Sequence, residues 1–257
     1  MTSTNPPALQ LYTLRDQLAG DRPGVLGRVA ALGYGAVEVF DVLSDTRGLR
    51  DDLARAGLTV CSVHATLSAD QLPEVVEAAR TLGTDTVIVP YVPPERFSDA
   101  DGIGELAREL NEAARRLAGD GMRLGYHNHA FELSTIVGGR PALEVLADGL
   151  DDDVLLEVDT YWAAVGGQDV PALLGRLGER VRYLHVKDGP LTEGEPNVAV
   201  GTGRMPVAEI VAASPSATWH IVEFDQCATD LLTAVGDSLA WLADQGLAQP
   251  VARGAGT

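Results

Sequence analysis

Four short apolar runs in this sequence each end in ionisable side chains. Because side chains two apart on a β-strand share one face, Glu157 and Asp159 are expected to point one way, as are His185 and Lys187. A set of carboxylates and imidazoles is what a divalent cation needs, and four such ends point to one shared site. The runs cover residues 122–129, 154–159, 181–188 and 219–225.

Three of these side chains are the strongest candidates for metal ligands. Asp159, His185 and Glu223 each form the last inward-facing charged or imidazole group of a predicted strand. The fourth ligand is His127 if the fifth strand matches the others in depth, or Glu157 if the metal sits lower. This nitrogen and oxygen set suits one divalent cation, Mn²⁺ first, with Co²⁺, Mg²⁺ or Zn²⁺ as alternatives, and it excludes a thiolate site.

Other polar residues near these strand ends have a plainer interpretation. A lone histidine at a strand end is as often structural as functional, and His64 is such a residue. His220 stands three positions before Glu223 and therefore faces the opposite side of its strand, so we interpret it as structural. Asp188 and Asp225 can simply cap turns.

The elements that must position these residues follow from an alternation of short apolar runs with longer amphipathic ones, which favours βα units and a parallel sheet. Eight strands, each followed by a helix, close such a sheet, so we predict an α/β fold, a single (β/α)8 TIM barrel with its site at the C-terminal ends of the strands. The predicted strands cover residues 8–14, 36–40, 59–65, 86–89, 123–127, 154–159, 181–186 and 220–224, and the predicted helices cover 24–32, 47–56, 68–82, 102–118, 142–147, 170–177, 207–213 and 229–245.

The predicted barrel uses residues 1–257 as one domain, with a frayed tail over about 251–257. One connection, residues 188–205, is unusually long and rich in Gly, Pro and Glu. Loops of this length are commonly functional, but a plain surface excursion is about equally well supported. Its segment 201–204, Gly-Thr-Gly-Arg, could cradle a phosphate with backbone N–H groups, although a flexible turn is the favoured interpretation.

Composition narrows the classes of partner. The 257-residue chain is 46% hydrophobic and 22% charged, which is typical of a globular protein. Its formal net charge of −18 would repel phosphate backbones and no basic stripe compensates, so we expect no nucleic acid. We also expect no membrane, because no stretch approaches the ~18 apolar residues of a span. With only Cys61 and Cys227 and no signal-peptide pattern, a cytoplasmic protein is expected.

Six segments together resemble the xylose isomerase-like TIM barrel superfamily, in its sugar phosphate isomerase/epimerase branch. The resemblance covers almost the whole chain, and the fifth-strand and sixth-strand segments are its most specific parts. The segments are 9–16 (LQLYTLRD), 33–38 (GYGAVE), 62–64 (SVH), 125–129 (GYHNH), 157–162 (EVDTYW) and 185–188 (HVKD).

The resemblance implies a ligand set and catalytic roles. In relatives such as the ketohexose 3-epimerases, Glu, Asp, His and Glu from strands five to eight hold the metal, and the two glutamates move the proton. Asp159, His185 and Glu223 correspond directly, whereas the first glutamate is absent, so His127 or Glu157 would replace it. Glu223 is the expected base. The other implied roles are proton return by His127, His129 or Glu157, oxyanion neutralisation by Lys187, and pocket lining by Tyr12, Glu38, His64 and Trp162.

The expected function is therefore a metal-dependent isomerase or epimerase of a sugar, sugar phosphate or cyclic polyol, acting through α-proton abstraction and a metal-stabilised enediolate. Because the same enediolate can instead lose a β-hydroxyl, an inosose-type dehydratase is the alternative. A non-catalytic sugar-binding barrel is a further alternative, which the intact ligand set disfavours. The superfamily's endonuclease branch is disfavoured by the acidic charge and by too few histidines for a trinuclear zinc site. The expected partner is a small sugar or polyol, and a homo-oligomer is left open.

Overall fold

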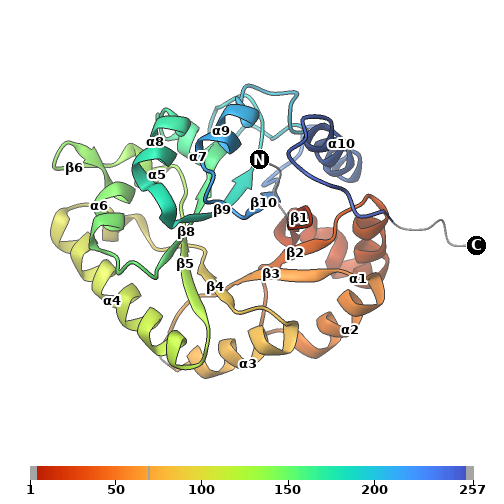
Figure 1. Cartoon of the computed structure of the whole chain (residues 1–257), viewed down its shortest axis with the longest axis horizontal. Coiled ribbons are helices and arrows are strands. Elements are labelled where there is room, and N and C mark those ends of the chain that lie inside the picture. The colour runs from red at the N-terminus through yellow and green to blue at the C-terminus, as the bar shows by residue number, and fades with distance from the viewer. Residues whose placement is uncertain (1–4, 69, 253–257) are drawn as a thin grey trace, which may run out of the picture.

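The computed structural model describes residues 5–68 and 70–252, and in them a closed parallel barrel confirms the predicted fold. The strands follow one another around the barrel in the order β1-β10-β9-β8-β5-β4-β3-β2, and helices surround them (Figure 1). The barrel strands are β1 (Ala8–Gln10), β2 (Ala36–Val39), β3 (Thr59–His64), β4 (Thr86–Val89), β5 (Arg123–His127), β8 (Leu155–Asp159), β9 (Val181–Val186) and β10 (Trp219–Val222).

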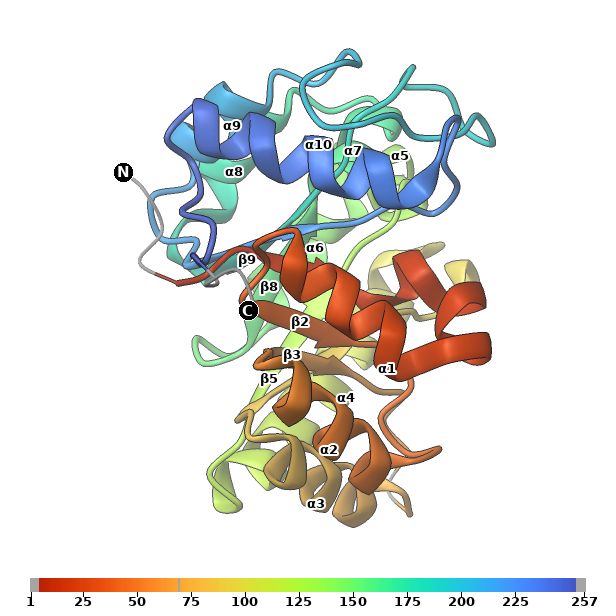
Figure 2. The same ribbon diagram turned by 90° about the vertical axis from the view of Figure 1, so that its right-hand side faces the viewer.

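The helices largely follow the predicted apolar stripes, and the ranges 170–177 and 207–213 agree to the residue. Seen from the side, α2, α3 and α4 gather at one end of the molecule and α7 to α10 at the other (Figure 2). The helices are α1 (Arg15–Ala31), α2 (Thr46–Ala56), α3 (Leu72–Leu82), α4 (Ala100–Gly119), α5 (Phe131–Ser134), α6 (Ala142–Gly149), α7 (Thr160–Val165), α8 (Val170–Leu177), α9 (Val207–Ala213) and α10 (Leu231–Asp244), with 3₁₀ turns η1 (Leu11–Leu14), η2 (Pro94–Phe97) and η3 (Gly178–Arg180).

Helix α1 begins well before the predicted range 24–32, and its interior explains why. Asp21 has non-helical backbone angles (φ −151°, ψ 73°), and its Oδ1 accepts a hydrogen bond from Gly24 N at 3.0 Å. Pro23 follows directly and fits the first turn of a helix. The predicted helix is thus the second of two merged segments, capped by Asp21.

The predicted first strand, 8–14, is wrong in its second half. The strand ends at Gln10, whose side-chain oxygen accepts a hydrogen bond from Tyr12 N at 3.0 Å and so caps the 3₁₀ turn η1. The last strand is also shorter than predicted: β10 ends at Val222, so Glu223 lies just beyond it. Phe224 N then donates to Thr13 Oγ1 at 3.1 Å, which links the last strand end to the first.

A small hairpin after β5 was not predicted. Strands β6 (Ile136–Val137) and β7 (Arg140–Pro141) pair antiparallel. Gly138 and Gly139 between them both have positive φ, 61° and 82°, as a two-residue hairpin turn requires. The hairpin and α5 lie between β5 and α6 in the chain, so the connection after the fifth strand carries local structure of its own.

The barrel interior is layered. On three strands an apolar residue lies two positions before the ionisable one: Ala36 precedes Glu38, Tyr183 precedes His185 and Ile221 precedes Glu223. Side chains two apart share a face, so these residues fill the barrel below the ionisable groups. The Tyr183 hydroxyl reaches Thr86 Oγ1 at 3.2 Å. The polar site therefore stands on an apolar floor at the C-terminal end of the barrel.

The long connection 188–205 is folded around one carboxylate. Asp188 is buried; its Oδ1 accepts from Gly189 N at 2.8 Å and Met205 N at 3.0 Å, and its Oδ2 accepts from Gly201 N and Gly203 N, both at 2.9 Å. The N–H groups that a phosphate cradle would need are therefore engaged inside the protein. The segment is an anchored turn, which agrees with the predicted capping role of Asp188.

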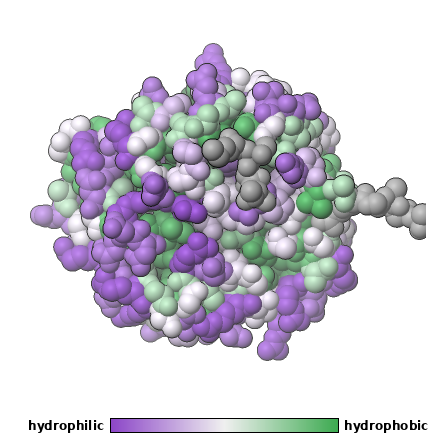
Figure 3. Space-filling model, viewed as in Figure 1, coloured by the Kyte–Doolittle hydropathy of each residue, from purple (hydrophilic) through white to green (hydrophobic). Residues whose placement is uncertain are grey.

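The outer surface is mostly hydrophilic on the face shown in Figure 3, with small scattered hydrophobic areas. Among the described residues, no helix has the length and apolar character to cross a membrane. Of the tail predicted to fray, Val251 N donates to Gly33 O at 2.8 Å, and residues 253–257 lie outside the described residues.

Candidate active site

A pocket of about 300 Å³ opens at the C-terminal ends of the strands. Its walls combine aromatic rings with imidazoles, a lysine and carboxylates, which is the composition of a site for a small polar molecule. The lining residues are Tyr12, Phe40, His64, Pro90, Tyr91, His127, His129, Lys187, Glu223 and Asp225.

Lys187 lies at the centre of the outer part of the site. Its Nζ is 2.9 Å from Asp159 Oδ2, 2.8 Å from Glu223 Oε2 and 2.8 Å from Asp225 Oδ2. The side chain is only 1% exposed, and a buried ammonium group needs such partners to offset its lost hydration. The ring of Trp162 lies 5.7 Å from the same nitrogen. Asp225, interpreted from sequence as a turn cap, is thus part of the charge cluster.

His185 connects the outer part of the site to a deeper part. Its Nδ1 is 2.6 Å from Glu223 Oε2, whereas its Nε2 is 2.6 Å from Glu38 Oε2 and 3.1 Å from Glu157 Oε1. The two ring nitrogens therefore face different carboxylates. The ring is fully buried on β9, so His185 contacts both parts of the site at once.

In the deeper part, three imidazoles converge on one oxygen atom. Glu157 Oε1 lies 2.8 Å from His64 Nε2, 3.1 Å from His127 Nδ1 and 3.1 Å from His185 Nε2. Glu38 lies beside them, 3.1 Å from His64 Nε2 through its Oε2. Two further side chains orient Glu38: Gln10 Nε2 donates to its Oε2 at 2.8 Å, and the Ser62 hydroxyl donates to its Oε1.

Burial and neighbouring charges shift the pKa values of the carboxyl groups in opposite directions. Burial alone would raise the pKa of Glu223, but Lys187 and His185 outweigh it and hold that pKa well below its usual range. Burial would also raise the pKa of Glu38, but His64 and His185 hold it well below its usual range. For Asp159 burial prevails over Lys187 and raises the pKa to about 6. Lys187 and His185 thus hold Glu223 in its ionised form.

The histidines divide into two kinds. Burial opposes protonation of His64, yet Glu38 and Glu157 raise its pKa to about 10. Burial also opposes protonation of His185, but Glu157, Glu223 and Glu38 raise its pKa well above the usual value. His127 lies well below its usual pKa, chiefly because it is buried. Burial and Lys187 lower the pKa of His129 to about 4. His127 and His129 are therefore the neutral imidazoles that face the pocket.

The arrangement offers two groups of donor atoms that fit a cation. Asp159, His185 and Glu223 form one group, and His64, His127, Glu157 and His185 form the other; within each group the donor atoms lie within 4.8 Å of one another. Two buried oxygen atoms, Asp159 Oδ2 and Glu157 Oε2, have no hydrogen-bond partner among the described residues. The Asp159 oxygen lies at ion-pair distance from Lys187 but without hydrogen-bond geometry. The Glu157 oxygen is therefore available to a ligand, whereas a ligand at the Asp159 oxygen would share it with Lys187.

The predicted residues are thus brought together, but not as a single ligand set. His127 joins His64 and Glu157, one level deeper than Asp159 and Glu223. Tyr12 stands at the pocket rim, 40% exposed, with its ring edge against Phe40. His220 lies outside both groups, and burial lowers its pKa, as a structural histidine would show.

Sequence reasoning missed Gln10, Ser62 and Glu132. Gln10 fell within a strand that was drawn too long, and Ser62 gave no signal other than standing two positions before His64. Glu132 is fully buried; its Oε1 accepts from Tyr126 Oη at 2.9 Å and its Oε2 from His129 N at 2.8 Å. Burial raises its pKa to about 7. It therefore holds the segment that carries His129.

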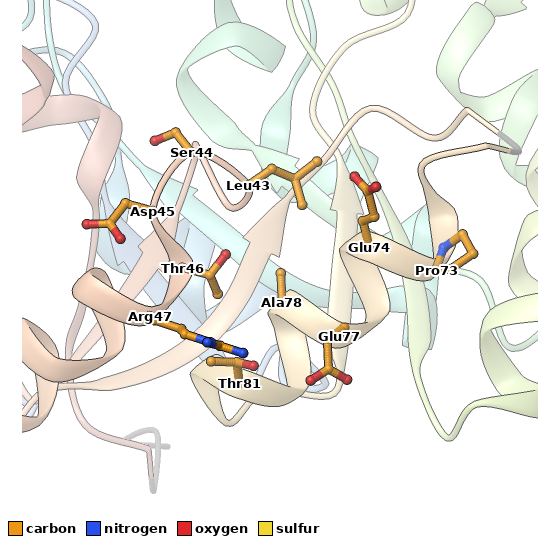
Figure 4. A pocket seen from close by; sticks show the side chains of 10 residues that line it. All are labelled: Leu43, Ser44, Asp45, Thr46, Arg47, Pro73, Glu74, Glu77, Ala78 and Thr81. Carbon is orange, nitrogen blue, oxygen red and sulfur yellow. The ribbon is translucent and has the colours of Figure 1, made fainter.

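A larger hollow of about 540 Å³ lies elsewhere, between the loop that leads into α2 and helix α3 (Figure 4). Its ionisable side chains are Asp45, Arg47, Glu74 and Glu77, and all of its lining residues belong to exterior segments. It lacks the imidazoles and buried charge of the barrel pocket. Size alone therefore does not mark the functional site.

The family model described as Xylose isomerase-like TIM barrel matches residues 26–245 of this chain. An inosose dehydratase from Geobacillus kaustophilus is 30% identical over 191 residues, which cover 64% of this chain and 61% of that protein. The chain thus spans less than two thirds of the length of that relative.

Two solved structures share the fold. A sugar phosphate isomerase/epimerase from Parabacteroides distasonis has a TM-score of 0.80 at 23% identity, with 95% of each chain covered. A xylose isomerase-like TIM barrel protein from Mycobacterium smegmatis, solved in complex with magnesium, has a TM-score of 0.69 at 15% identity, covering 96% of this chain and 98% of the other. At these identities the likeness shows a common fold.

Proposed function

Because the chain belongs to the xylose isomerase-like TIM barrel family, we propose that it is a divalent-metal-dependent isomerase or epimerase of a sugar, sugar phosphate or cyclic polyol. The observation that carries the proposal is the convergence of Asp159, His185 and Glu223. Of these Glu223 reaches the pocket, whose wall also carries the neutral histidines His127 and His129. A carboxylate base, a cation site and a second proton carrier are what an α-proton transfer requires.

Asp159, His185 and Glu223 would hold the cation, with His127 or Glu157 as the predicted fourth ligand. We propose Mn²⁺, since hard oxygen donors and one imidazole suit Mn²⁺ or Mg²⁺, and a magnesium complex of a neighbour supports this class. When bound, the cation supplies polarisation of the substrate carbonyl and the adjacent hydroxyl, which stabilises the enediolate.

Glu223 is proposed to remove the α-proton. It lines the pocket, and its depressed pKa keeps it ionised at neutral pH. His129 or His127 would donate a proton to the opposite face after taking one up from solvent, while Glu223 keeps the proton that it removed. Both imidazoles line the pocket, and the buried His129 Nδ1 has no hydrogen-bond partner among the described residues. Lys187 would compensate negative charge that develops on the substrate oxygen.

A dehydratase is the second candidate function, and the 30% identity to inosose dehydratase favours it. The first step is common, because both reactions remove the proton next to the carbonyl. In the dehydratase the carbanion then expels a β-hydroxyl, and a general acid must protonate that leaving group. Glu223, which holds the α-proton after the first step, could donate it to this hydroxyl, so that water leaves.

The two functions are separated by following the substrate. The full-length protein is incubated with Mn²⁺ in D₂O with a panel of ketoses, their phosphates and inososes, and NMR follows exchange of the α-proton. Epimerisation gives deuterated stereoisomers, whereas dehydration gives an enone with ultraviolet absorbance. Absence of exchange in every member of the panel would count against both functions.

Two further assignments belong to this proposal. Cys61 and Cys227 are free thiols, which supports a reducing, cytoplasmic setting. The partner is a small sugar or polyol, as the pocket volume of about 300 Å³ supports.

A further inference from the structure

We propose that the barrel contains a second cation site, below the Asp159–Glu223 pocket, formed by His64, His127, Glu157 and the Nε2 atom of His185, and that it takes a nitrogen-preferring transition metal ion such as Zn²⁺ or Co²⁺. This inner site goes beyond the reaction proposed above, although it shares His185 with the outer group and uses His127 and Glu157, the two candidates for the fourth outer ligand. Its residues come from β3, β5, β8 and β9, so four separate strands would be joined through one ion.

The donor atoms already meet at one point. Three imidazole nitrogens lie 2.8–3.1 Å from Glu157 Oε1. In a tetrahedral zinc site with bonds of roughly 2.0–2.1 Å, neighbouring donors stand roughly 3.3 Å apart. The three distances from the Glu157 oxygen are thus only a few tenths of an ångström shorter than this spacing, and all the donor atoms lie within 4.8 Å of one another.

The second, independent observation is the other oxygen of Glu157. Glu157 is fully buried, and its Oε2 has no hydrogen-bond partner among the described residues. A buried carboxylate oxygen without a partner is costly unless a ligand satisfies it. A cation between the imidazoles could bond to Glu157 through either oxygen, so this group has capacity that the protein alone leaves unused.

The surroundings favour a positive ion. Glu38 is also fully buried and lies 2.6 Å from His185 Nε2 and 3.1 Å from His64 Nε2. Gln10 and Ser62 fix Glu38 by hydrogen bonds, as outer partners commonly fix the groups around a metal. Glu38 thus adds a second buried carboxylate beside Glu157, and its negative charge favours a cation between the imidazoles. His64 and His127 also line the pocket, which gives an ion a route inward.

The donor types set the two sites apart. The inner site has three imidazoles and one carboxylate, a set that suits Zn²⁺ or Co²⁺, whereas the outer group has two carboxylates and one imidazole, which suits Mn²⁺ or Mg²⁺. The two groups share only His185, whose Nδ1 faces Glu223 and whose Nε2 faces Glu157. One ring could therefore serve both ions through different nitrogens once its ring proton has been released to solvent.

The test uses Co²⁺ as the probe and the full-length chain. Bound metal is removed with a chelator, Co²⁺ is titrated, and equilibrium dialysis with elemental analysis gives the stoichiometry while the visible spectrum reports coordination. The wild type should bind two Co²⁺ per chain. His64→Ala should lose the inner ion, with affinity there reduced by more than ~100-fold, beyond the range typical of losing an outer partner. Asp159→Asn should keep the inner ion with its intense four-coordinate absorption bands.

Two controls keep the result interpretable. His220→Gln removes a buried histidine outside both groups and should still bind two ions. His64→Gln retains a polar side chain of similar length, and circular dichroism with gel filtration verifies the fold of each variant. One Co²⁺ in the wild type that Asp159→Asn removes and His64→Ala leaves would overturn the inner site. One Co²⁺ that only His64→Ala removes would support the inner site while counting against the outer ligand set of the proposed function.

Discussion

At the scale of single residues, Glu223 combines two roles that one substitution can separate. Glu223→Gln keeps the shape of the side chain and a carbonyl oxygen for the cation, but it cannot accept a proton at neutral pH. We expect α-proton exchange to fall by ~10²–10⁴ even when Mn²⁺ is raised until occupancy is restored. NMR exchange rates at measured metal occupancy provide the test.

The matched control for this variant is Asp225→Asn. Asp225 lies two positions after Glu223, and the carboxylates of both residues contact Lys187. It should retain most of the exchange activity. If additional Mn²⁺ fully rescues Glu223→Gln, then Glu223 is a ligand only, and the base must be sought at His127, His129 or Glu157.

Glu132 should make the stability of the protein depend on pH. Burial raises its pKa from 4.5 to about 7, so between these values the folded state holds a proton that the unfolded state has released. Stability from this group is therefore complete below pH 4.5 and is lost as the pH rises towards 7. Glu132→Gln imitates the protonated form and should be more stable than the wild type above pH 7, by roughly 3 kcal/mol.

Urea unfolding of both proteins in chelator, at several pH values from 5 to 8, measures this difference. The advantage of Glu132→Gln should grow across that window and level off above it. A constant difference between the two proteins would show that Glu132 does not change its protonation there. Glu209→Gln, on α9, is a control at an exposed position.

The sequence predicted which residues form the site better than it predicted which of them contact one another. Period-two spacing placed Glu157 with Asp159 and His185 with Lys187 inside the barrel, and family resemblance added Glu38 and His64. Spacing gives no depth across strands, however. Register shifts between β2 and β3 and between β8 and β9 help to decide which strand ends meet, and no local pattern encodes them.

At the scale of elements, Asp188 is the anchor of the long connection after β9. Asp188→Ala would leave four backbone N–H groups without their acceptor, and the loop should become mobile at a cost of roughly 3 kcal/mol. We expect faster tryptic cleavage after Arg204 and a lower urea midpoint. Glu193→Ala, at an exposed position of the same connection, should change neither quantity.

Unchanged cleavage in Asp188→Ala would mean that other contacts suffice to hold this connection. The example also shows what limited the element predictions. Amphipathic stripes located the long helices, and glycines such as Gly57 and Gly83 ended them in left-handed conformations. Non-local caps, such as Asp188 holding residues up to Met205, decide loop structure, and sequence spacing does not reveal them.

At the scale of the whole molecule, closure of the barrel joins distant parts of the chain. Strand β1 pairs with β10 through Ala8 and Leu9, and the Tyr34 hydroxyl donates to Val235 O at 3.0 Å. The eightfold alternation of apolar and amphipathic segments predicts this closure, because eight βα units leave no free edge. Most of the acidic side chains of the described residues lie outside the buried core.

Binding of the outer cation should stabilise the closed barrel against unfolding. Its ligands come from β8, from β9 and from the segment after β10, and they separate when the barrel unfolds. An ion that binds only the folded state stabilises it by about 2.7 kcal/mol at a concentration 100 times its Kd. For a domain of this size, that corresponds to a rise in Tm of roughly 5–10 °C. Scanning calorimetry with and without Mn²⁺ measures the shift, which chelator should reverse.

Asp159→Asn should show little of this rise in Tm, while His220→Gln should show all of it. An equal shift in wild type and Asp159→Asn would place the stabilising Mn²⁺ away from Asp159.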